Sequence, residues 1–262
     1  MEPSSNTLIP NHELKDFLDF KANQYENVNF IQTDPIQIPK KFKTKEDIEI
    51  IAFIMAIIAW GNRKSIITSG EKLIDIVGDS PLDFVLNYKT KKKQNLHFIH
   101  RTFNGSDLDF FFRSLQNIYT KYGGLENCFF ANSPKEQNLF HRIMNFRDIF
   151  TEVQHPQRSL KHLANPSAKS ACKRIVMYLR WMVRSNEKGV DFGMWKSINS
   201  SELMVPLDVH TANISRKLLL LHRKQNDWSS NIELRNQLLK FDPTDPAKYD
   251  FALFGLGAFE NF

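Results

Sequence analysis

One apolar segment constrains the fold more than any other feature of this sequence. The run IIAFIMAIIAW, from Ile50 to Trp60, contains no charged residue. It is too short to cross a bilayer, which takes about 20 apolar residues. Thr44 precedes the run as a helix N-cap, and Gly61 follows it as a helix stop. We therefore predict a helix that is apolar on nearly all sides and lies at the centre of the protein.

The rest of the sequence favours helices as well. The chain has only 10 glycines but 22 phenylalanines, and no segment shows the sustained apolar–polar alternation of a half-buried strand. We therefore expect an all-α fold. Predicted helices cover residues 44–61, 63–78, 106–124 with Ser106 as the cap, 133–150 opening at Ser133 and Pro134, 167–185, 209–218, 228–241 and 247–257.

Charge and cysteine content narrow the class of protein. The formal net charge is +6 and the sequence pI is about 9.2, which suits a polyanion such as nucleic acid but also plain solubility or an anionic membrane surface. Two cysteines, Cys128 and Cys172, supply neither a disulfide scaffold nor the four thiolates of an iron–sulfur cluster. The N-terminal segment shows no signal-peptide pattern. We expect a cytoplasmic monomer, not bound to membranes, that uses no metal, nucleotide or other cofactor.

The segment VPLDVHTANISRKL, from Val205 to Leu218, holds the first candidate for catalysis. Asp208 stands where a helix N-cap is expected, and its charge suits the positive end of the helix dipole. Pro206 restricts the approach to this position. A carboxylate held so rigidly could also serve catalysis, and the residue type alone favours the simpler role of a cap.

A second group of candidates lies upstream, in the predicted helix 167–185. Lys169, Lys173 and Arg180 are spaced by four and seven residues, which places them on one side of a helix. Because the remaining surface of this helix is strongly apolar, such a basic side must face solvent, a cleft or a polyanion. An ordinary solvated stripe is the simpler alternative.

These two segments resemble the helix-hairpin-helix DNA glycosylase superfamily. VPLDVHTANISRKL is similar to the segment that carries its catalytic aspartate, and the order Pro-x-Asp-Val-His is most like the 8-oxoguanine glycosylases. KRIVMYLRWM, residues 173–182, resembles the lysine-bearing helix of the archaeal 8-oxoguanine glycosylases. The separation, 208 − 173 = 35 residues, is also closer to that branch. From about Lys45 onward the chain also resembles a bacterial family of about this length, in phrases such as SACKRIVMYLRWMVR, RKQNDW and DPAKYDFALFGLG.

The resemblance implies a fold and an activity. It implies a two-lobed, glycosylase-like unit over residues 1–262, with lobes at roughly 44–160 and at 1–43 plus 161–262. It implies excision of an oxidised purine such as 8-oxoguanine from double-stranded DNA, after the base has been flipped out of the duplex. Lys173 would attack C1′ of the sugar and form a Schiff base, and Asp208 would stabilise positive charge on the sugar. Strand cleavage by β-elimination would make the enzyme a bifunctional AP lyase.

The same resemblance suggests binding residues, although each aromatic among them is by itself more typical of a core. We expect the flipped base and its sugar to contact Trp60, Asn62, Phe254 and His210. We expect the DNA backbone to contact Arg63, Lys64, Lys169 and Arg180, since each phosphate contact would add to the salt dependence of binding.

The chain departs from the superfamily at the hairpin. The usual Leu-Pro-Gly-Val-Gly is replaced by LANPSAKSACK, which has no glycine. Phosphate binding would then depend on Ser167, Ser170 or helix N-terminal amides. Counting from Leu163 also makes Lys169 an alternative nucleophile, whereas the following helix favours Lys173. A non-catalytic DNA- or RNA-binding protein with the same scaffold therefore stays open, as does a helical interaction protein whose charge is incidental.

Overall fold

The computed structural model describes residues 11–89, 96–130, 138–260 and 262, and the fold is all-α as predicted. One short antiparallel hairpin, which the sequence did not predict, pairs β1 (Ile99–His100) with β2 (Phe103–Asn104). The helices are α1 (Asn11–Tyr25), α2 (Val28–Ile31), α3 (Lys45–Ile58), α4 (Arg63–Val77), α5 (Pro81–Leu86), α6 (Gly105–Lys121), α7 (Leu125–Phe130), α8 (Leu139–Phe150), α9 (Lys173–Val183), α10 (Val209–Lys217), α11 (Trp228–Phe241) and α12 (Tyr249–Phe259). Short 3-10 turns are η1 (Pro35–Gln37), η2 (Pro39–Lys41), η3 (Gln157–His162), η4 (Pro166–Ala168), η5 (Ser200–Glu202) and η6 (Pro246–Lys248).

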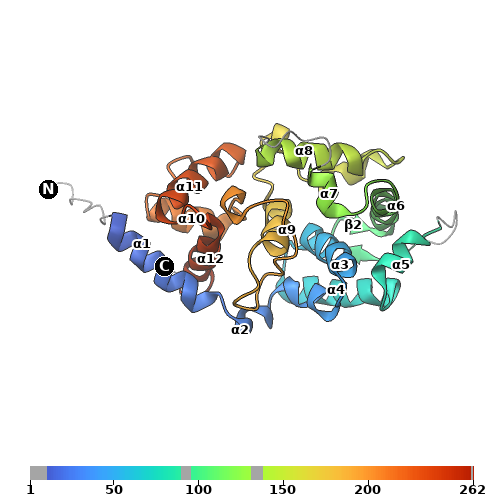
Figure 1. The fold of residues 1–262 in the computed structure, drawn as a ribbon, viewed down its shortest axis with the longest axis horizontal. Coiled ribbons are helices and arrows are strands. Elements are labelled where there is room, and N and C mark those ends of the chain that lie inside the picture. The colour runs from blue at the N-terminus through green and yellow to red at the C-terminus, as the bar shows by residue number, and fades with distance from the viewer. Residues whose placement is uncertain (1–10, 90–95, 131–137, 261) are drawn as a thin grey trace.

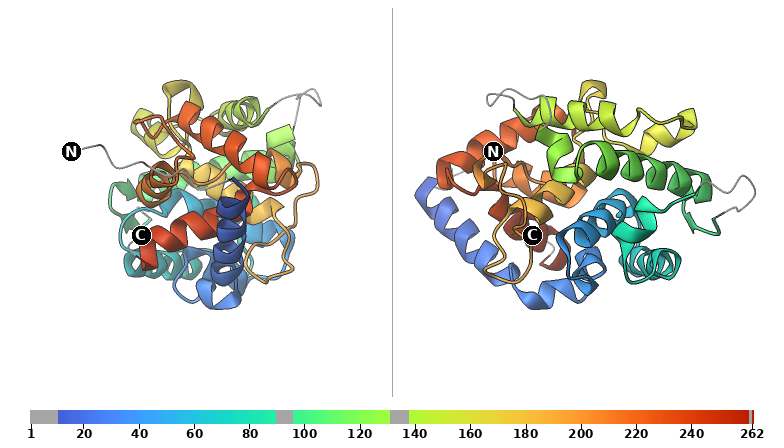
Figure 2. Two further views of the ribbon diagram at one scale, coloured as in Figure 1. Left: turned by 90° about the vertical axis from the view of Figure 1, so that its left-hand side faces the viewer. Right: turned by 45° about the vertical axis from the view of Figure 1, so that its right-hand side comes forward.

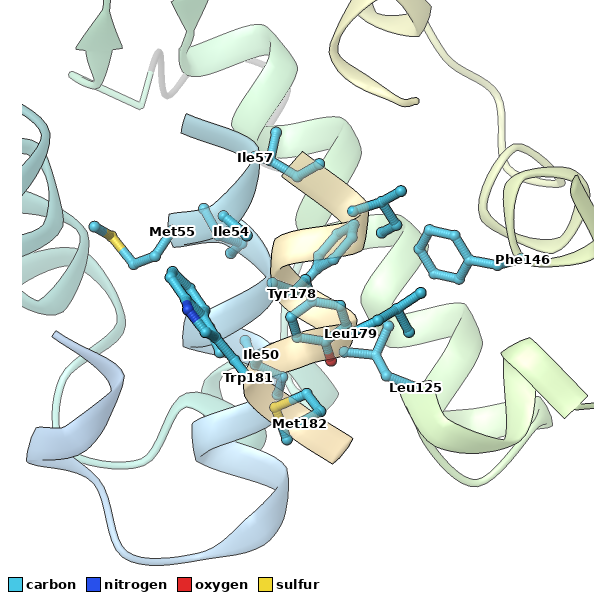
Figure 3. Packing of buried hydrophobic residues seen from close by; sticks show 14 of the residues in the cluster. Ile50, Ile54, Met55, Ile57, Leu125, Phe146, Tyr178, Leu179, Trp181 and Met182 are labelled. Atoms are coloured by element: carbon cyan, nitrogen blue, oxygen red, sulfur yellow. The ribbon is translucent and has the colours of Figure 1, made fainter. Parts of the chain in front are cut away.

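The predicted central helix is confirmed as α3. Every residue from Asp47 to Ile58 is buried. Helix α3 packs against α9, and Figure 3 shows Ile50 and Ile54 of α3 on the side of Tyr178 and Trp181 of α9. The Thr44 side chain accepts the backbone N–H of Asp47, so the predicted N-cap is also correct. The helix ends before Ala59 instead of at Gly61. Within the described ranges, no helix has both the length and the apolar character needed to cross a membrane.

Buried apolar side chains form two clusters, one on each side of the molecule. The larger draws mainly on α3 to α9, and the smaller on α1, α10, α11 and α12. Figures 1 and 2 show α9 between these two groups of helices. The buried residues of α9, such as Trp181, belong to the larger cluster, whereas the sequence analysis grouped this segment with the C-terminal helices.

A buried ionic network attaches α9 to the rest of the chain. The Arg184 guanidinium lies 2.6 Å from Glu26, 2.7 Å from Asp191 and 2.8 Å from Asp245. These carboxylates come from the segment after α1, from the loop after α9 and from the turn before α12. Because removing one partner of a buried ion pair leaves an uncompensated charge, the network fixes these segments relative to α9.

The start of α9 differs from the prediction. The sequence suggested a helix from residue 167, but residues 166–168 form η4, and Lys169 and Cys172 have positive φ angles of 61° and 54°. The Asn165 side chain accepts the backbone N–H groups of Ser167 and Ala168. This local capping competes with helix formation, so the helix starts at Lys173.

Two other predicted helix caps have different outcomes. The cap of α6 is Asn104, which accepts from Ser106 and Asp107, so the prediction of Ser106 is wrong. Ser133 and Pro134 lie outside the described residues, and α8 begins after Asn138.

Candidate functional site

A cavity of about 490 Å³ lies where α9 meets the α3–α4 junction, α10 and α12. Trp60, Lys173, Asp208 and Phe254 all contribute to its wall. These residues are far apart in the sequence, and the packing of α9 between the two groups of helices brings them together. The volume falls in the usual range for ligand pockets, about 300–1,000 Å³.

Lys173 and Asp208 form an ion pair at the cavity wall. The Lys173 Nζ lies 3.2 Å from Asp208 Oδ2, and the side chains are 38% and 16% exposed. Lys173 is the first residue of α9, and Asp208 is the N-cap of α10. Asp208 Oδ1 accepts the backbone N–H of Thr211 at 2.9 Å, which confirms the predicted cap. One carboxylate oxygen therefore anchors the helix, while the other faces the lysine.

Aromatic side chains form another part of the wall. Phe254 is half-buried on α12, and the exposed His210 ring lies edge-on to it, 6.3 Å between centroids. The Arg63 guanidinium lies 5.0 Å from the centre of the Phe254 ring. The structure therefore brings Phe254, His210 and Arg63 to the same cavity.

The position of Trp60 is fixed from behind by two buried side chains. His100 Nε2 lies 3.1 Å from the Trp60 carbonyl oxygen, and His100 Nδ1 lies 2.9 Å from the Ser69 hydroxyl. Because a carbonyl can only accept, Nε2 donates and Nδ1 accepts from Ser69. Burial lowers the pKa of His100, which keeps the ring neutral. Arg101 covers the indole at 4.9 Å.

Asp250 lines the cavity although it was not among the predicted site residues, and the predicted Arg180 lies buried in the same wall. Arg180 is only 4% exposed and pairs with Asp250 and, at 3.4 Å, with Asp191. This burial argues against the prediction that Arg180 contacts DNA phosphates, because carboxylates already compensate its charge. Asp250 precedes Phe254 by four residues, which puts both on one face of α12. That spacing was the available signal.

Two carboxyl groups of this cavity, those of Asp250 and Asp34, have raised pKa values. Burial raises the pKa of Asp250 to about 6, with Arg180 acting in the opposite direction. Asp34 also lines the cavity, where it accepts the backbone N–H of Ile36 at 3.0 Å and caps η1. Burial raises the pKa of Asp34 as well. Cavity carboxyl groups with raised pKa values are typical of functional sites, although structural networks also produce them.

Three predicted binding residues lie outside this cavity. Asn62 caps α4, where it accepts from Ser65 at 3.4 Å, and it lines a separate surface depression together with Lys64. Lys169 is exposed and lines a third depression beside Trp228. The structure therefore separates Asn62, Lys64 and Lys169 from the Lys173–Asp208 pair.

The chemistry of the cavity is that of an amine, carboxylates and aromatic rings. Among the residues that the structure describes, no group of three or more His, Cys, Asp or Glu side chains is placed to hold a metal ion. A lysine that reaches a pocket beside a fixed carboxylate can act as a nucleophile toward an electrophilic carbon. The carboxylate can stabilise positive charge that develops next to it.

Comparison with known proteins assigns the chain to a family. No curated protein and no solved structure gives a significant match. A family model matches residues 34–259, a range that includes the whole cavity wall from Asp34 to Phe259. The chain belongs to the family described as "Protein of unknown function (DUF2400)".

Proposed function

We propose that this protein is a DNA glycosylase with AP-lyase activity that excises an oxidised purine such as 8-oxoguanine. One observation carries the proposal: Lys173 Nζ lies 3.2 Å from Asp208 Oδ2 at the wall of a cavity that also presents aromatic surface. An amine nucleophile, a fixed carboxylate and a stacking surface are the parts that this chemistry requires.

The cavity would receive a nucleotide that has been flipped out of the duplex. The flipped base would stack against ring surface such as Phe254, and polar groups of Asp34 and Asp250 would face its edges. His210, exposed at the start of α10 next to Asp208, would contact the sugar. In this arrangement C1′ of the sugar lies between the base and the Lys173–Asp208 pair.

The reaction would proceed in two stages. The Lys173 ammonium first loses a proton to solvent, and its amine then attacks C1′. The N-glycosidic bond breaks, and its electron pair leaves with the base, which takes up a proton. The Asp208 carboxylate stabilises the positive charge that grows on the sugar during this step. Sugar-ring opening then gives a Schiff base between Nζ and C1′. Loss of a C2′ proton from this intermediate expels the 3′ phosphate by β-elimination and cleaves the strand.

The hairpin segment supports the proposal despite its lack of glycine. Lys169 and Cys172 adopt left-handed backbone conformations that glycine usually occupies. No side-chain hydrogen bond caps the start of α9 at Cys172. The Cys172 side chain therefore does not compete with a phosphate for the first-turn amides of α9.

Base release from a defined duplex tests the proposed activity. A duplex with a single 8-oxoguanine is incubated with wild-type protein and with Asp208→Asn, and free base and nicked strand are quantified separately. We expect both products with wild type and a large loss with the variant. If a panel of oxidised purines yields no base with wild type, the proposed activity is wrong.

The absence of hairpin glycines favours one alternative, a non-catalytic DNA- or RNA-binding protein. It predicts salt-sensitive binding without base release from any substrate. The base-release assay therefore distinguishes the two functions directly.

A further inference from the structure

A second groove adjoins the cavity and shares part of its rim. It has a volume of about 780 Å³ and lies between α8, η3 and residues 163–174. Trp60, Gly61 and Lys173 line both the groove and the cavity. A chain that lay in the groove would therefore pass directly beside Lys173.

The charged residues that line this groove, among those that the structure describes, are all basic. Arg147 from α8, Lys161 from η3 and Arg174 from α9 line it together with Lys173, and no Asp or Glu is among its described lining residues. By contrast, the cavity next to it contains Asp34, Asp208 and Asp250. The groove is also lined by the uncharged polar residues Gln157, Asn165, Ser170 and Asn226.

The two guanidinium groups are held in place by neutral partners. Arg147 donates to the carbonyl oxygen of Leu163 at 2.9 Å, and Arg174 donates to that of Ile57. Within the described part of the chain, no salt bridge involves Arg147, Lys161 or Arg174. Asp148, which follows Arg147 in the sequence, affects the pKa of Arg147 only by electrostatic attraction, which raises it.

Arg147 and Arg174 are partly buried, which increases the free-energy cost of leaving their charges without a counter-charge. Burial lowers the pKa of Arg174 and of Arg147, because each guanidinium has lost part of its hydration. A partly dehydrated cation without a carboxylate partner is compensated when an anion binds to it. The charges are also spread over α8, η3 and α9, which suits an extended anion better than a single phosphate.

We infer that this groove binds the phosphodiester backbone of the DNA strand whose damaged nucleotide enters the cavity. The inference rests on the proposed function. It places the strand on the α8–η3 side of Lys173, instead of along α4, where Arg63 and Lys64 were expected to contact the backbone. Arg174, which directly follows Lys173, would hold the phosphate nearest to the flipped nucleotide.

The salt dependence of DNA binding tests this path. Fluorescence anisotropy gives the affinity for a duplex that carries a stable abasic-site analogue, over a series of KCl concentrations, for wild type, Arg147→Gln and Lys161→Gln. Each lost phosphate contact should reduce the slope of log K against log salt by about 0.9. Lys240→Gln, on the distal half of α11 and exposed, is the matched control and should leave the slope unchanged.

Each outcome separates the groove from the proposed activity. Reduced slopes in both groove variants, with the wild-type slope in Lys240→Gln, would support the path. Unchanged slopes in both groove variants would overturn it, and so would an equal reduction in Lys240→Gln. If wild type forms adduct while the groove variants bind normally, only the groove assignment is wrong. If wild type binds no duplex, both proposals fail.

Discussion

Asp208 is expected to have two roles that substitution can separate. Oδ1 caps α10 through the N–H of Thr211, and Oδ2 faces Lys173. Asparagine keeps a side-chain oxygen for the cap but removes the charge, whereas alanine removes both. Because Asn and Asp are about equally good N-caps, Asp208→Asn should preserve α10 and abolish only the electrostatic role.

The structure sets the size of each effect. Loss of an N-cap costs about 1 kcal/mol. The ion pair adds at most about 1 kcal/mol, because the Lys173 side chain is 38% exposed and solvent screens the pair. Asp208→Ala should therefore cost about 1–2 kcal/mol, which lowers the Tm of a protein of this size by roughly 2–8 °C. Asp208→Asn should cost less than about 1 kcal/mol. Removal of a preorganised charge should slow the chemical step by about 10²–10³-fold in both variants.

Two measurements on the same three proteins separate the roles. Thermal unfolding followed by circular dichroism gives the stability order, and single-turnover base release gives the chemical rate. We expect similar rate losses in both variants but a clearly larger Tm loss in Asp208→Ala. A wild-type rate in Asp208→Asn would refute the electrostatic role, and equal Tm losses would refute the separation of cap from charge.

Three further predictions concern stability. Because burial raises the pKa of Asp250 from 3.8 to about 6, the folded state keeps a proton between these pH values that the unfolded chain has lost. Wild type should therefore lose stability relative to Asp250→Asn as the pH rises through this window. Denaturant titrations at several pH values measure the difference in stability, and a difference that does not change with pH would contradict the prediction. Phe53→Ala, at a fully buried ring, should lower the free energy of unfolding in urea by about 3–5 kcal/mol. The control Phe20→Ala, at a ring that is 64% exposed, should change it by no more than about 0.5 kcal/mol. Similar losses in both variants would contradict the prediction. A Cβ on Gly255 would lie 2.2 Å from Cδ2 of Tyr25. Gly255→Ala should therefore lower the free energy of unfolding by about 1–3 kcal/mol, because it forces α12 away from α1. An unchanged urea midpoint would argue against this close packing.

Local physical chemistry explains which parts of the fold could be predicted. The apolar run from Ile50 has no polar face to offer to water, so burial at the centre follows from composition alone. Asp208 directly precedes a helical pattern, and an N-cap needs no tertiary information. The start of α9 required more, because Asn165 captures two backbone N–H groups and delays the helix to Lys173.

The arrangement of the candidate site could not be predicted from local sequence patterns, because it depends on tertiary contacts between separate helices and loops. Lys173 and Arg180 were expected on one side of a helix that faces solvent, a cleft or a polyanion. Arg180 is instead buried, because Asp191 in the loop after α9 and Asp250 on α12 supply its counter-charges. The proximity of Lys173 to Asp208 was suggested by family resemblance, and only the three-dimensional structure gives it a distance. Lys169 was placed on the same helix as Lys173, yet the left-handed turn at Lys169 directs it to another depression.

Borohydride trapping on a duplex that contains 8-oxoguanine tests the central claim most directly. Wild type, Lys173→Ala and Lys169→Ala are compared, because a Schiff base is reduced to a stable covalent adduct only at the nucleophilic lysine. We predict an adduct with wild type and Lys169→Ala and none with Lys173→Ala. Loss of the adduct only in Lys169→Ala, or no adduct with wild type on any oxidised purine, would contradict the assignment of Lys173.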